Sequence, residues 1–333
     1  MLLNDPTISI VHNDLTATNG FTLSAVMHNE MYFLPDFLAH YRKLGVERFI
    51  LLDDKSDDGS FEFAAEQPDV MILKSDYRYG DQIGEPHHGP KTRAMLAWRQ
   101  TILSKYCSNQ WSLHLDLDEF IELPEGLTFP AFLSNVNSST PAVIFGAMID
   151  LYPKTWGEIM DDGQKPISDV KWFFDGRPHL RLRRKSDPKM IYSGARARLR
   201  STFNIPCENE KLSHRIKRWL NGNPYQRMGT QIKPILINWG ENFQFRSSHR
   251  IKHATSLPII LPIAHYKFAP NFAARVQFAI ESGAYNNGSR GYRELRQLYE
   301  AMSAQNADFV DATSMPFYGF DSFKKAGIAI GIE

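Results

Sequence analysis

The chain has 333 residues, of which 43% are hydrophobic and 23% are charged, and these proportions are close to those of an average soluble globular protein. This length is enough for one large domain, or for one domain with a smaller companion. The formal net charge is +1, which excludes a molecule built as a whole around nucleic-acid binding.

Cysteine content and hydropathy indicate the cellular compartment and exclude some classes of protein. Cys107 and Cys207 are the only cysteines, which excludes a disulfide framework and favours a reducing compartment. No apolar run reaches the ~20 residues that a membrane-spanning helix needs, and the N-terminus lacks the basic and apolar segments of a signal peptide. We therefore expect a cytoplasmic protein with no transmembrane segment, for which peripheral association with the inner face of a membrane stays open.

The first ~120 residues alternate strand and helix patterns. A helix is predicted to start near Asn29, because apolar residues from Phe33 to Leu44 fall on one helical face. Gly45 is a suitable C-terminal stop for this helix. The predicted strands cover residues 22–27, 46–52, 70–73 and 111–120, and the predicted helices cover 29–44, 61–66 and 91–106. Such a series predicts a mostly parallel sheet covered by helices on both faces, with ligands bound beyond the carboxyl ends of its strands.

The rest of the chain has a mixed pattern. Strand-like segments (142–149, 190–192, 235–237) alternate with polar loops, two helices are expected at 272–282 and 292–303, and basic tracts run over 177–200 and 211–218. We expect an α/β half over residues 1–125 and a mixed α+β half over residues 126–333, joined in one continuous domain.

The clearest motif is Asp116-Leu117-Asp118, at the end of the strand predicted from Trp111. Alternation along a strand would place both carboxylates on one face, about 7 Å apart. Like charges this close repel each other, and a cation relieves the repulsion. Mg²⁺ or Mn²⁺, held together with diphosphate oxygens, is a common solution. The alternatives are an acidic strand end in solvent and an N-cap for a following helix.

A second acidic segment, residues 51–60, follows the second predicted strand. Asp53 and Asp54 could accept hydrogen bonds from a base or a ribose, and the sequence Asp58-Gly59-Ser60 favours a turn and a helix start. An EF-hand is excluded because its twelfth position, normally Glu, is Ala65 here. A capped turn that binds no ligand is the alternative that remains.

Two pairs of residues add candidate ligand contacts. Lys91 and Arg93 open a predicted helix, where a bound anion would account for two cations; two solvated side chains are the alternative. His265 and Lys267 would share a face if they lie on a strand, with His265 toward a metal and Lys267 toward a phosphate. A purely structural histidine is the alternative there.

Together these segments resemble the family 2 glycosyltransferases and the related family 92 group, which share the GT-A (Rossmann-like) fold. The resemblance covers about residues 20 to 125, with one further segment near the C-terminal end. Its motifs are Val26-Met-His-Asn29-Glu30, Leu34-Pro-Asp-Phe37, His40-Tyr41, Leu51-Leu-Asp53-Asp54-Lys-Ser-Asp57-Asp58-Gly59-Ser60, Asp116-Leu-Asp118-Glu-Phe120 and His265-Tyr-Lys267-Phe268.

The resemblance implies which residues bind the donor. Asp53 or Asp54 would recognise the nucleotide, and Arg93 would lie near the diphosphate. Asp116 and Asp118 would hold the nucleotide and a Mn²⁺ or Mg²⁺ ion, with His265 as a further metal ligand. The expected nucleotide-binding residues are Asn29, Glu30, Asp53, Asp54, Lys91, Arg93, Asp116 and Lys267.

Family members usually invert the anomeric centre with an Asp or Glu as base. In this sequence Asp150, Asp175, Glu241 and Glu281 are all candidates for that base, and no pattern selects one of them. The basic tract over residues 181–200 could receive an acidic glycan; the alternative, a solvated basic strand pair, is slightly favoured.

The expected activity is transfer of a hexose from a UDP-linked donor to a glycan or other hydroxyl acceptor, as in polysaccharide biosynthesis. Residues 1–125 would bind the nucleotide sugar, and residues 126–333 would bind the acceptor. One alternative is a sugar nucleotidyltransferase, but His28-Asn29-Glu30 replaces the Gly-rich, basic loop that this class carries after its first strand. Another is an inactive glycan-binding or scaffold protein with the same fold.

Overall fold

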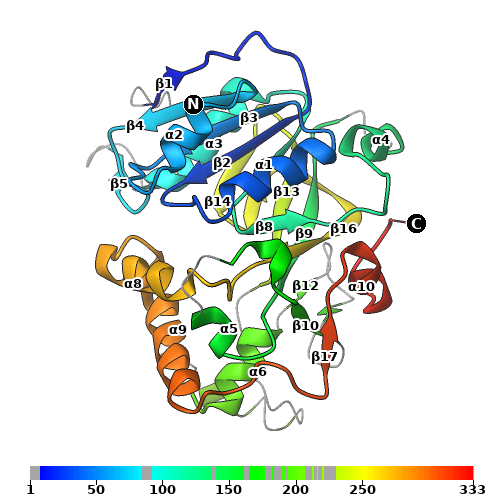
Figure 1. Ribbon diagram of the computed structural model, residues 1–333. Helices are drawn as coiled ribbons and strands as arrows, with labels where there is room; N and C mark the ends of the chain where they lie inside the picture. The colour runs from blue at the N-terminus through cyan, green and yellow to red at the C-terminus, as the bar shows by residue number, and fades with distance from the viewer. Residues whose placement is uncertain are drawn as a thin grey trace. The chain divides into compact units, whose positions relative to one another are not determined.

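The structure, a computed structural model, describes residues 8–84, 92–136, 140–160, 165–176, 182–183, 190–191, 194–206, 212–213, 216, 220 and 230–332. The chain divides into two compact units, each assembled from separate stretches (Figure 1). The first unit comprises Met1–Gly146, Lys233–Leu261 and Ile330–Glu333, and the second comprises Ala147–Ile232 and Pro262–Ala329.

A large mixed sheet organises the described part of the chain. Its nine strands run in the order β1-β4-β3-β2-β7-β13-β9-β16-β8. Their bounds are β1 Ile8–His12, β2 Thr22–Met27, β3 Arg48–Asp53, β4 Val70–Ser75, β7 Trp111–Leu115, β8 Glu119–Ile121, β9 Ala142–Asp150, β13 Ile232–Asn238 and β16 Thr255–His265.

Four adjacent strands of this sheet, β4, β3, β2 and β7, are parallel. Every residue of β3 is buried, as expected for a strand whose two faces are both covered. β1 pairs antiparallel with β4, and β13 pairs antiparallel with β7, so the sheet is mixed outside this core. The predicted α/β class is confirmed, and the arrangement is compatible with a Rossmann-like fold.

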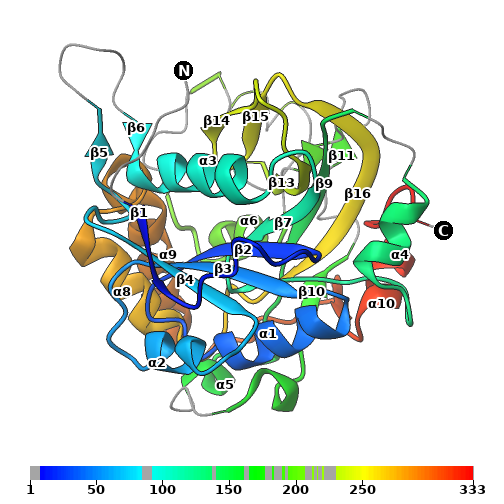
Figure 2. The same ribbon diagram turned by 90° about the horizontal axis from the view of Figure 1, so that it is seen from above.

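Helices cover both faces of the parallel strands, with α3 on one side and α1 and α2 on the other (Figure 2). α1 (Leu34–Lys43) buries Leu34, Phe37, Leu38 and Tyr41, which is the apolar face that the sequence predicts. The chain leaves α1 through Gly45 at φ 89°, as expected for a glycine C-cap. The remaining helices of the first unit are α2 (Ser60–Ala65), α3 (Ala94–Tyr106) and α4 (Phe129–Ser134).

Two helices of the first unit, α1 and α3, begin at least three residues after their predicted starts. α1 begins at Leu34 rather than near Asn29, because the N–H groups of Asn29 and Glu30 donate to Ser56 and Ser60, which follow β3. α3 begins at Ala94 rather than Lys91, because Thr92–Arg93 form β6, which pairs with β5 (Gln82–Ile83). A two-stranded pair, β14 (Gln244–Ser247) with β15 (Arg250–Lys252), completes the first unit.

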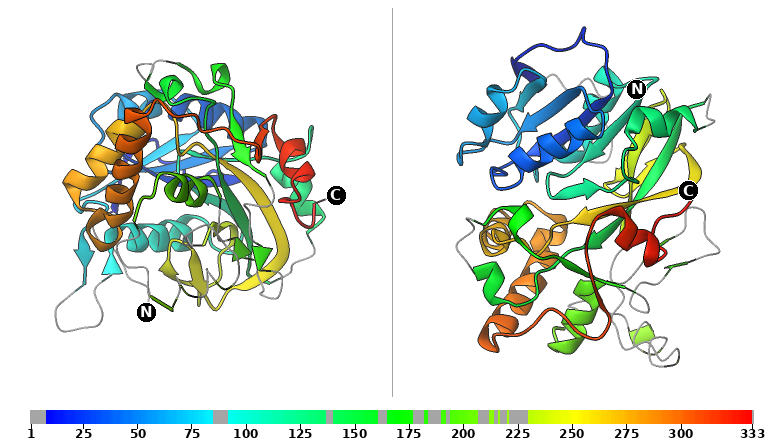
Figure 3. Two further views of the ribbon diagram at one scale, coloured as in Figure 1. Left: turned by 90° about the horizontal axis from the view of Figure 1, so that it is seen from below. Right: turned by 45° about the vertical axis from the view of Figure 1, so that its right-hand side comes forward.

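The second unit has its own hydrophobic core, in which aromatic side chains such as Trp156 and Phe309 pack with aliphatic ones such as Leu199. Figure 3 gives two further views of the helices and strands of this unit. α8 (Phe272–Ser282) has the bounds that its periodicity predicts, whereas α9 (Asn286–Ala304) begins six residues before the predicted start at 292. The other elements are α5 Gly157–Met160, a 3₁₀ turn Ile167–Asp169, β10 Phe173–Asp175, β11 Leu182–Arg183, β12 Met190–Ile191, α6 Ala195–Thr202, β17 Ser314–Pro316 and α10 Phe320–Lys325.

None of the helices in the described ranges combines the length and the apolar character needed to cross a bilayer. Nine of the twenty residues in the predicted basic tract at 181–200, and most of the tract at 211–218, lie outside the described residues.

Candidate functional site

The acidic motif after β7 forms a tight turn. The sequence predicts one strand from Trp111 to Phe120, and this prediction is wrong. β7 ends at Leu115, β8 begins at Glu119, and the three residues between them form the turn. The Glu119 N–H donates to the Asp116 carbonyl oxygen (3.1 Å), and the Asp116 N–H donates to Glu119 Oε2 (3.1 Å). The spacing of Asp116 and Asp118 is therefore set by a turn, for which aspartate is well suited.

Two buried cations face this turn. Arg99, on α3, and Lys233, on β13, are 1% and 2% exposed. Arg99 Nη2 lies 2.7 Å from Asp116 Oδ1, and Lys233 Nζ lies 2.9 Å from Asp116 Oδ2. Lys233 Nζ also lies 2.6 Å from Glu119 Oε2. Both carboxylate oxygens of Asp116 are thus engaged in ion pairs, although its side chain is 43% exposed.

These contacts fix the charge of Asp116. Burial by itself would raise the pKa of the Asp116 carboxyl group, but the positive charges of Lys233 and Arg99 outweigh it and lower the pKa. Two cations and three carboxylates (Asp116, Asp118 and Glu119) leave one formal negative charge at the turn. A bound cation would complement that charge.

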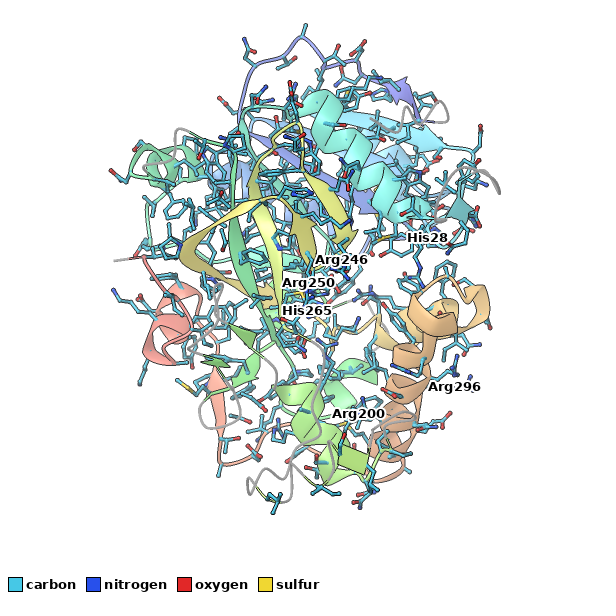
Figure 4. The ribbon with its side chains drawn as sticks, turned by 180° about the vertical axis from the view of Figure 1, so that it is seen from behind. His28, Arg200, Arg246, Arg250, His265 and Arg296 are labelled. Atoms are coloured by element: carbon cyan, nitrogen blue, oxygen red, sulfur yellow. The ribbon has the colours of Figure 1, made fainter. Side chains whose placement is uncertain are left out.

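Asp118, Glu119 and His265 form a buried group whose ligand atoms all lie within 4.8 Å of one another, so the group could hold a metal ion. Asp118 precedes β8, and His265 ends β16 (Figure 4); these strands are neighbours in the sheet. The sequence predicts Asp116, Asp118 and His265 as metal ligands. Two of these residues belong to the group, and Glu119 stands in it where Asp116 was expected.

His265 is held by a carboxylate. Its Nδ1 lies 2.6 Å from Asp150 Oδ1, and Arg196 Nε donates to Asp150 Oδ2 (2.6 Å). Arg196 Nη2 in turn donates to Gln231 Oε1 (2.8 Å). A carboxylate on one ring nitrogen fixes the orientation of an imidazole, as is common around metal-binding histidines. Burial would raise the pKa of Asp150, but Arg196 and the hydrogen bond from His265 lower it overall.

The predicted nucleotide residues meet at the carboxyl ends of two parallel strands. β2 and β3 pair with Met27 opposite Asp53, so Asn29 and Glu30 lie beside the acidic loop. Asn29 and Asp57 exchange two hydrogen bonds, of 2.7 and 2.9 Å. The Asn29 N–H donates to Ser56 Oγ (3.1 Å), and the Glu30 N–H donates to Ser60 Oγ (2.9 Å). This arrangement brings Asn29, Glu30, Asp53 and Asp54 together.

Asp53 and Asp54 are both buried at this edge, 1% and 6% exposed. Asp53 Oδ1 accepts from the Ser56 N–H (3.1 Å), and Asp54 Oδ2 accepts from the Tyr79 N–H (3.1 Å). Among the described residues, Asp53 Oδ2 and Asp54 Oδ1 have no hydrogen-bond partner. Burial is the main reason that the pKa of Asp54 is raised. Each of these oxygens lies 3.7 Å from a cation, Lys74 Nζ at Asp53 and Arg78 Nη1 at Asp54, so a ligand donor would share the oxygen with an ion pair.

The remaining predicted donor contacts are less well defined by the structure. Arg93 is half-buried in β6, directly before α3, and Lys91 lies outside the described residues. Lys267 is buried, with its Nζ 4.9 Å from the centre of the Tyr292 ring. The roles assigned to these three cations stay predictions.

Four carboxylates were candidates for the catalytic base. Asp150 and Asp175 line one small cavity of the second unit, of about 10 Å³, together with Gln231, which is room for about one water molecule. Asp175 is bound by Arg198 at 2.9 to 3.1 Å. Glu241 is exposed in a turn, and Glu281 is exposed on α8. The two buried carboxylates, Asp150 and Asp175, are both ion-paired, and the two glutamates are exposed. Which of the four acts as the catalytic base therefore stays a prediction.

Sequence reasoning missed Arg99, Lys233, Glu119 and Arg196 as members of the charge network. The signal for Lys233 was present, because one lysine interrupts the otherwise apolar segment Ile232-Lys-Pro-Ile-Leu-Ile237. A charged side chain inside a buried strand requires a partner. Arg99 similarly lies on the buried side of α3. Spacing alone could not reveal which carboxylates these cations meet.

A comparison with models of known protein families finds no match to this chain, and a search of curated proteins finds none either.

Proposed function

We propose that this protein is a metal-dependent glycosyltransferase of GT-A type, which moves a sugar from a nucleotide sugar to a hydroxyl acceptor. The observation that carries the proposal is the buried Asp118–Glu119–His265 group, whose acidic members follow the fourth parallel strand of the α/β sheet. Ligands of such sheets bind beyond the carboxyl ends of the strands. Asp53 and Asp54 lie at another carboxyl end of the same parallel set.

The donor nucleotide is assigned to the loop after β3. The buried oxygens of Asp53 and Asp54 that lack a hydrogen-bond partner can accept from the N–H of a base and from ribose hydroxyls. We propose UDP as the nucleotide, because uracil offers one N–H donor and the ribose offers two hydroxyls. Each of these groups donates one hydrogen bond, and a carboxylate oxygen accepts such a bond well.

The metal is assigned to Asp118, Glu119 and His265. Two carboxylates and an imidazole suit Mn²⁺ better than Mg²⁺, which prefers oxygen ligands and retains its waters. When bound, the ion would neutralise the charge that develops on the departing diphosphate. Asp116 takes a different part, because Arg99 and Lys233 already occupy both of its oxygens. Its partly exposed carboxylate would accept hydrogen bonds from the donor.

The acceptor side needs a carboxylate that takes a proton from the attacking hydroxyl. Asp150 is a weak base, since its pKa is lowered by Arg196 and His265, and we propose that it positions the His265 ring. The acceptor base is then sought among Asp175, Glu241 and Glu281. Single displacement with inversion is the proposed stereochemical course.

A sugar nucleotidyltransferase is disfavoured by the loop after β2. In that class backbone N–H groups of this loop cradle phosphates. Here the N–H groups of Asn29, Glu30 and Met31 donate to Ser56 Oγ, Ser60 Oγ and Asp58 Oδ2, at 2.9 to 3.1 Å. These donors are already used, so the loop offers no phosphate cradle. An inactive scaffold protein would be distinguished by calorimetry, since it would bind neither UDP nor GDP in the presence of Mn²⁺.

The proposal is tested by Asp118→Asn. This change keeps the shape of the side chain but removes the charge of a proposed metal ligand, and we expect Mn²⁺-dependent hydrolysis or transfer from a UDP-sugar to fall by about 100-fold or more. Asp321→Asn is the matched control, because Asp321 is exposed on α10 and should leave the rate unchanged. Undiminished activity in Asp118→Asn would remove the metal role.

A further inference from the structure

A pair of strands in the first unit presents a group of cations to solvent. β14 and β15 are antiparallel, with Gln244 opposite Lys252 and Ser247 opposite Arg250. Exposed and half-buried residues alternate along both strands. The exposed residues of the pair and its end are Gln244, Arg246, Arg250, Lys252 and His253. We call the surface formed by Arg246, Arg250 and Lys252 the basic hairpin face.

The inward residues of this hairpin fasten it to the rest of the first unit. The Phe245 ring stacks on the Trp239 ring, with centroids 5.6 Å apart, and its centroid lies 6.3 Å from that of His114. Gln100, on α3, donates to a carbonyl oxygen just before β14 (2.8 Å) and accepts from the Phe245 N–H (3.1 Å). His114 is two residues before Asp116. The cations are therefore carried on a fixed support beside the strand that leads into the acidic turn, and a fixed support lowers the entropy cost of binding a ligand.

The protein does not compensate the charges of the basic hairpin face. Residues 242–280 contain no Asp or Glu, and Arg246, Arg250 and Lys252 form no side-chain hydrogen bond or ion pair with any described residue. Arg246 lies at a register shift directly before the pair of Ser247 and Arg250, so two guanidinium groups leave neighbouring strands close together (Figure 4). Like charges across a strand pair destabilise it. A bound anion would remove this repulsion.

The arrangement of the cations distinguishes between anionic partners. They are spread along two extended strands, on which residues two apart are separated by about 7 Å, whereas the donors of a phosphate site converge on one point. The hairpin, all of whose residues the structure describes, exposes no large hydrophobic side chain, and a lipid surface needs such an anchor besides charge. It also exposes no aromatic ring on which a nucleic-acid base could stack. A polymer with separated anionic groups fits best.

We propose that the basic hairpin face binds a glycan that carries carboxylate groups, as uronic acids do. The planar fork of a guanidinium group matches a carboxylate through two parallel hydrogen bonds. Arg246 and Arg250 would each hold one acidic sugar, and Lys252 would add a further attraction. The choice of a glycan over an acidic peptide rests on the proposed function, in which a glycan is the acceptor. The acceptor is thereby assigned to the class of acidic glycans.

Calorimetric titration of the full-length protein with polygalacturonate fragments tests this proposal. We expect binding that weakens as salt rises, and no binding to the same fragments after their carboxyl groups have been methyl-esterified. The combined change Arg246→Gln, Arg250→Gln and Lys252→Gln should weaken binding by about tenfold, because three exposed charge pairs are lost. Arg250→Gln alone, which should weaken binding about threefold, decides the matter if the triple variant fails to fold.

The matched control changes Lys171, Lys324 and Lys325 to Gln. It removes three exposed cations elsewhere and should bind polygalacturonate as the unchanged protein does. The proposal is overturned if the unchanged protein does not bind polygalacturonate, if esterified fragments bind equally well, or if a folded hairpin variant binds undiminished. Tighter binding of polyglutamate would assign the face to an acidic peptide and would overturn the proposal as well.

Binding of UDP with Mn²⁺, measured on the same samples, separates this proposal from the proposed function. UDP binding without polygalacturonate binding would overturn the assignment of the basic hairpin face and leave the proposed function standing. Polygalacturonate binding that the hairpin variants lose, in a protein that does not bind UDP, would overturn the proposed function and leave the basic hairpin face as a glycan-binding surface.

Discussion

The charge network around Asp116 shows how single residues set the properties of the candidate site. Lys233 joins two carboxylates, at 2.9 Å from Asp116 and 2.6 Å from Glu119, while it is itself 2% exposed. Removal of one partner from a buried network leaves the other charges unpaired. The loss of stability from unpaired buried charges is larger than the net stabilisation that the ion pairs provided. The lysine is therefore both a structural residue and a determinant of the charge at the turn.

Lys233→Met tests the structural role of this lysine through the free energy of unfolding. The change keeps most of the side-chain volume, and we expect it to lower the free energy of unfolding by about 3 kcal/mol, because Asp116 and Glu119 lose a buried cation. Lys74→Met is the control: Lys74 is 42% exposed and lies 3.7 Å from Asp53, so its loss should cost less than about 1 kcal/mol. Equal effects in urea denaturation would contradict the account.

Glu122, directly after β8, gives a prediction about pH. Burial raises the pKa of this carboxyl group to about 7, against a smaller opposing effect of Lys43. Since the pKa is higher in the folded than in the unfolded chain, the folded state is favoured at low pH. This advantage is lost as pH rises from the unfolded value of about 4.5 through 7.

Glu122→Gln should accordingly stabilise the protein at pH 8, by at most about 3 kcal/mol, and have little effect at pH 4. Thermal or urea unfolding across this range measures the effect. A variant whose advantage over the unchanged protein stays constant between pH 4 and pH 8 would show that Glu122 ionises normally.

At the scale of elements, the sequence pattern predicted the bounds of those helices and strands that depend on local burial alone. β2 and α8 have the predicted bounds, because β2 is a short, almost fully buried apolar run and the apolar residues of α8 follow the helical period. The prediction of one strand over 111–120 was wrong because it relied on the same kind of pattern. Its alternation continues through Asp116–Asp118, but the hydrogen bonds between Asp116 and Glu119 turn the chain there. Periodicity does not reveal this turn, because the residues that form it continue the alternation of the strand before it.

The turn after α1 gives a prediction at this scale. Gly45 has φ 89°, and a Cβ there would lie 3.0 Å from Pro130 Cδ. Gly45→Ala should lower the free energy of unfolding by about 2 to 4 kcal/mol, from a strained backbone and from this close contact. Gly126 has φ 77° with no atom within 4 Å of its Cβ position, so Gly126→Ala should cost only about 1 to 2 kcal/mol. Equal losses would show that the Pro130 contact is harmless.

At the scale of the whole molecule, the candidate site depends on contacts between residues far apart in the sequence. Asp150 meets both Arg196 and His265, and Lys233 meets both Asp116 and Glu119. The α/β class and the placing of Asp53, Asp54 and Asp118 after their strands follow from the order of the elements. The partners of those residues could not be predicted, because no spacing rule relates Arg99 to Asp116 or Lys233 to Glu119.

The central claim is that Asp118, Glu119 and His265 hold a metal that completes a nucleotide site, and thermal unfolding with UDP tests it most directly. A ligand that binds only the folded state, at about 100 times its dissociation constant, adds about 2.7 kcal/mol to its stability. We predict that UDP with Mn²⁺ raises the unfolding midpoint by several degrees, that UDP with a chelator does not, and that Asp118→Asn abolishes the Mn²⁺-dependent rise while Asp321→Asn retains it. A midpoint that UDP and Mn²⁺ leave unchanged, or one that rises equally in Asp118→Asn, would contradict the claim.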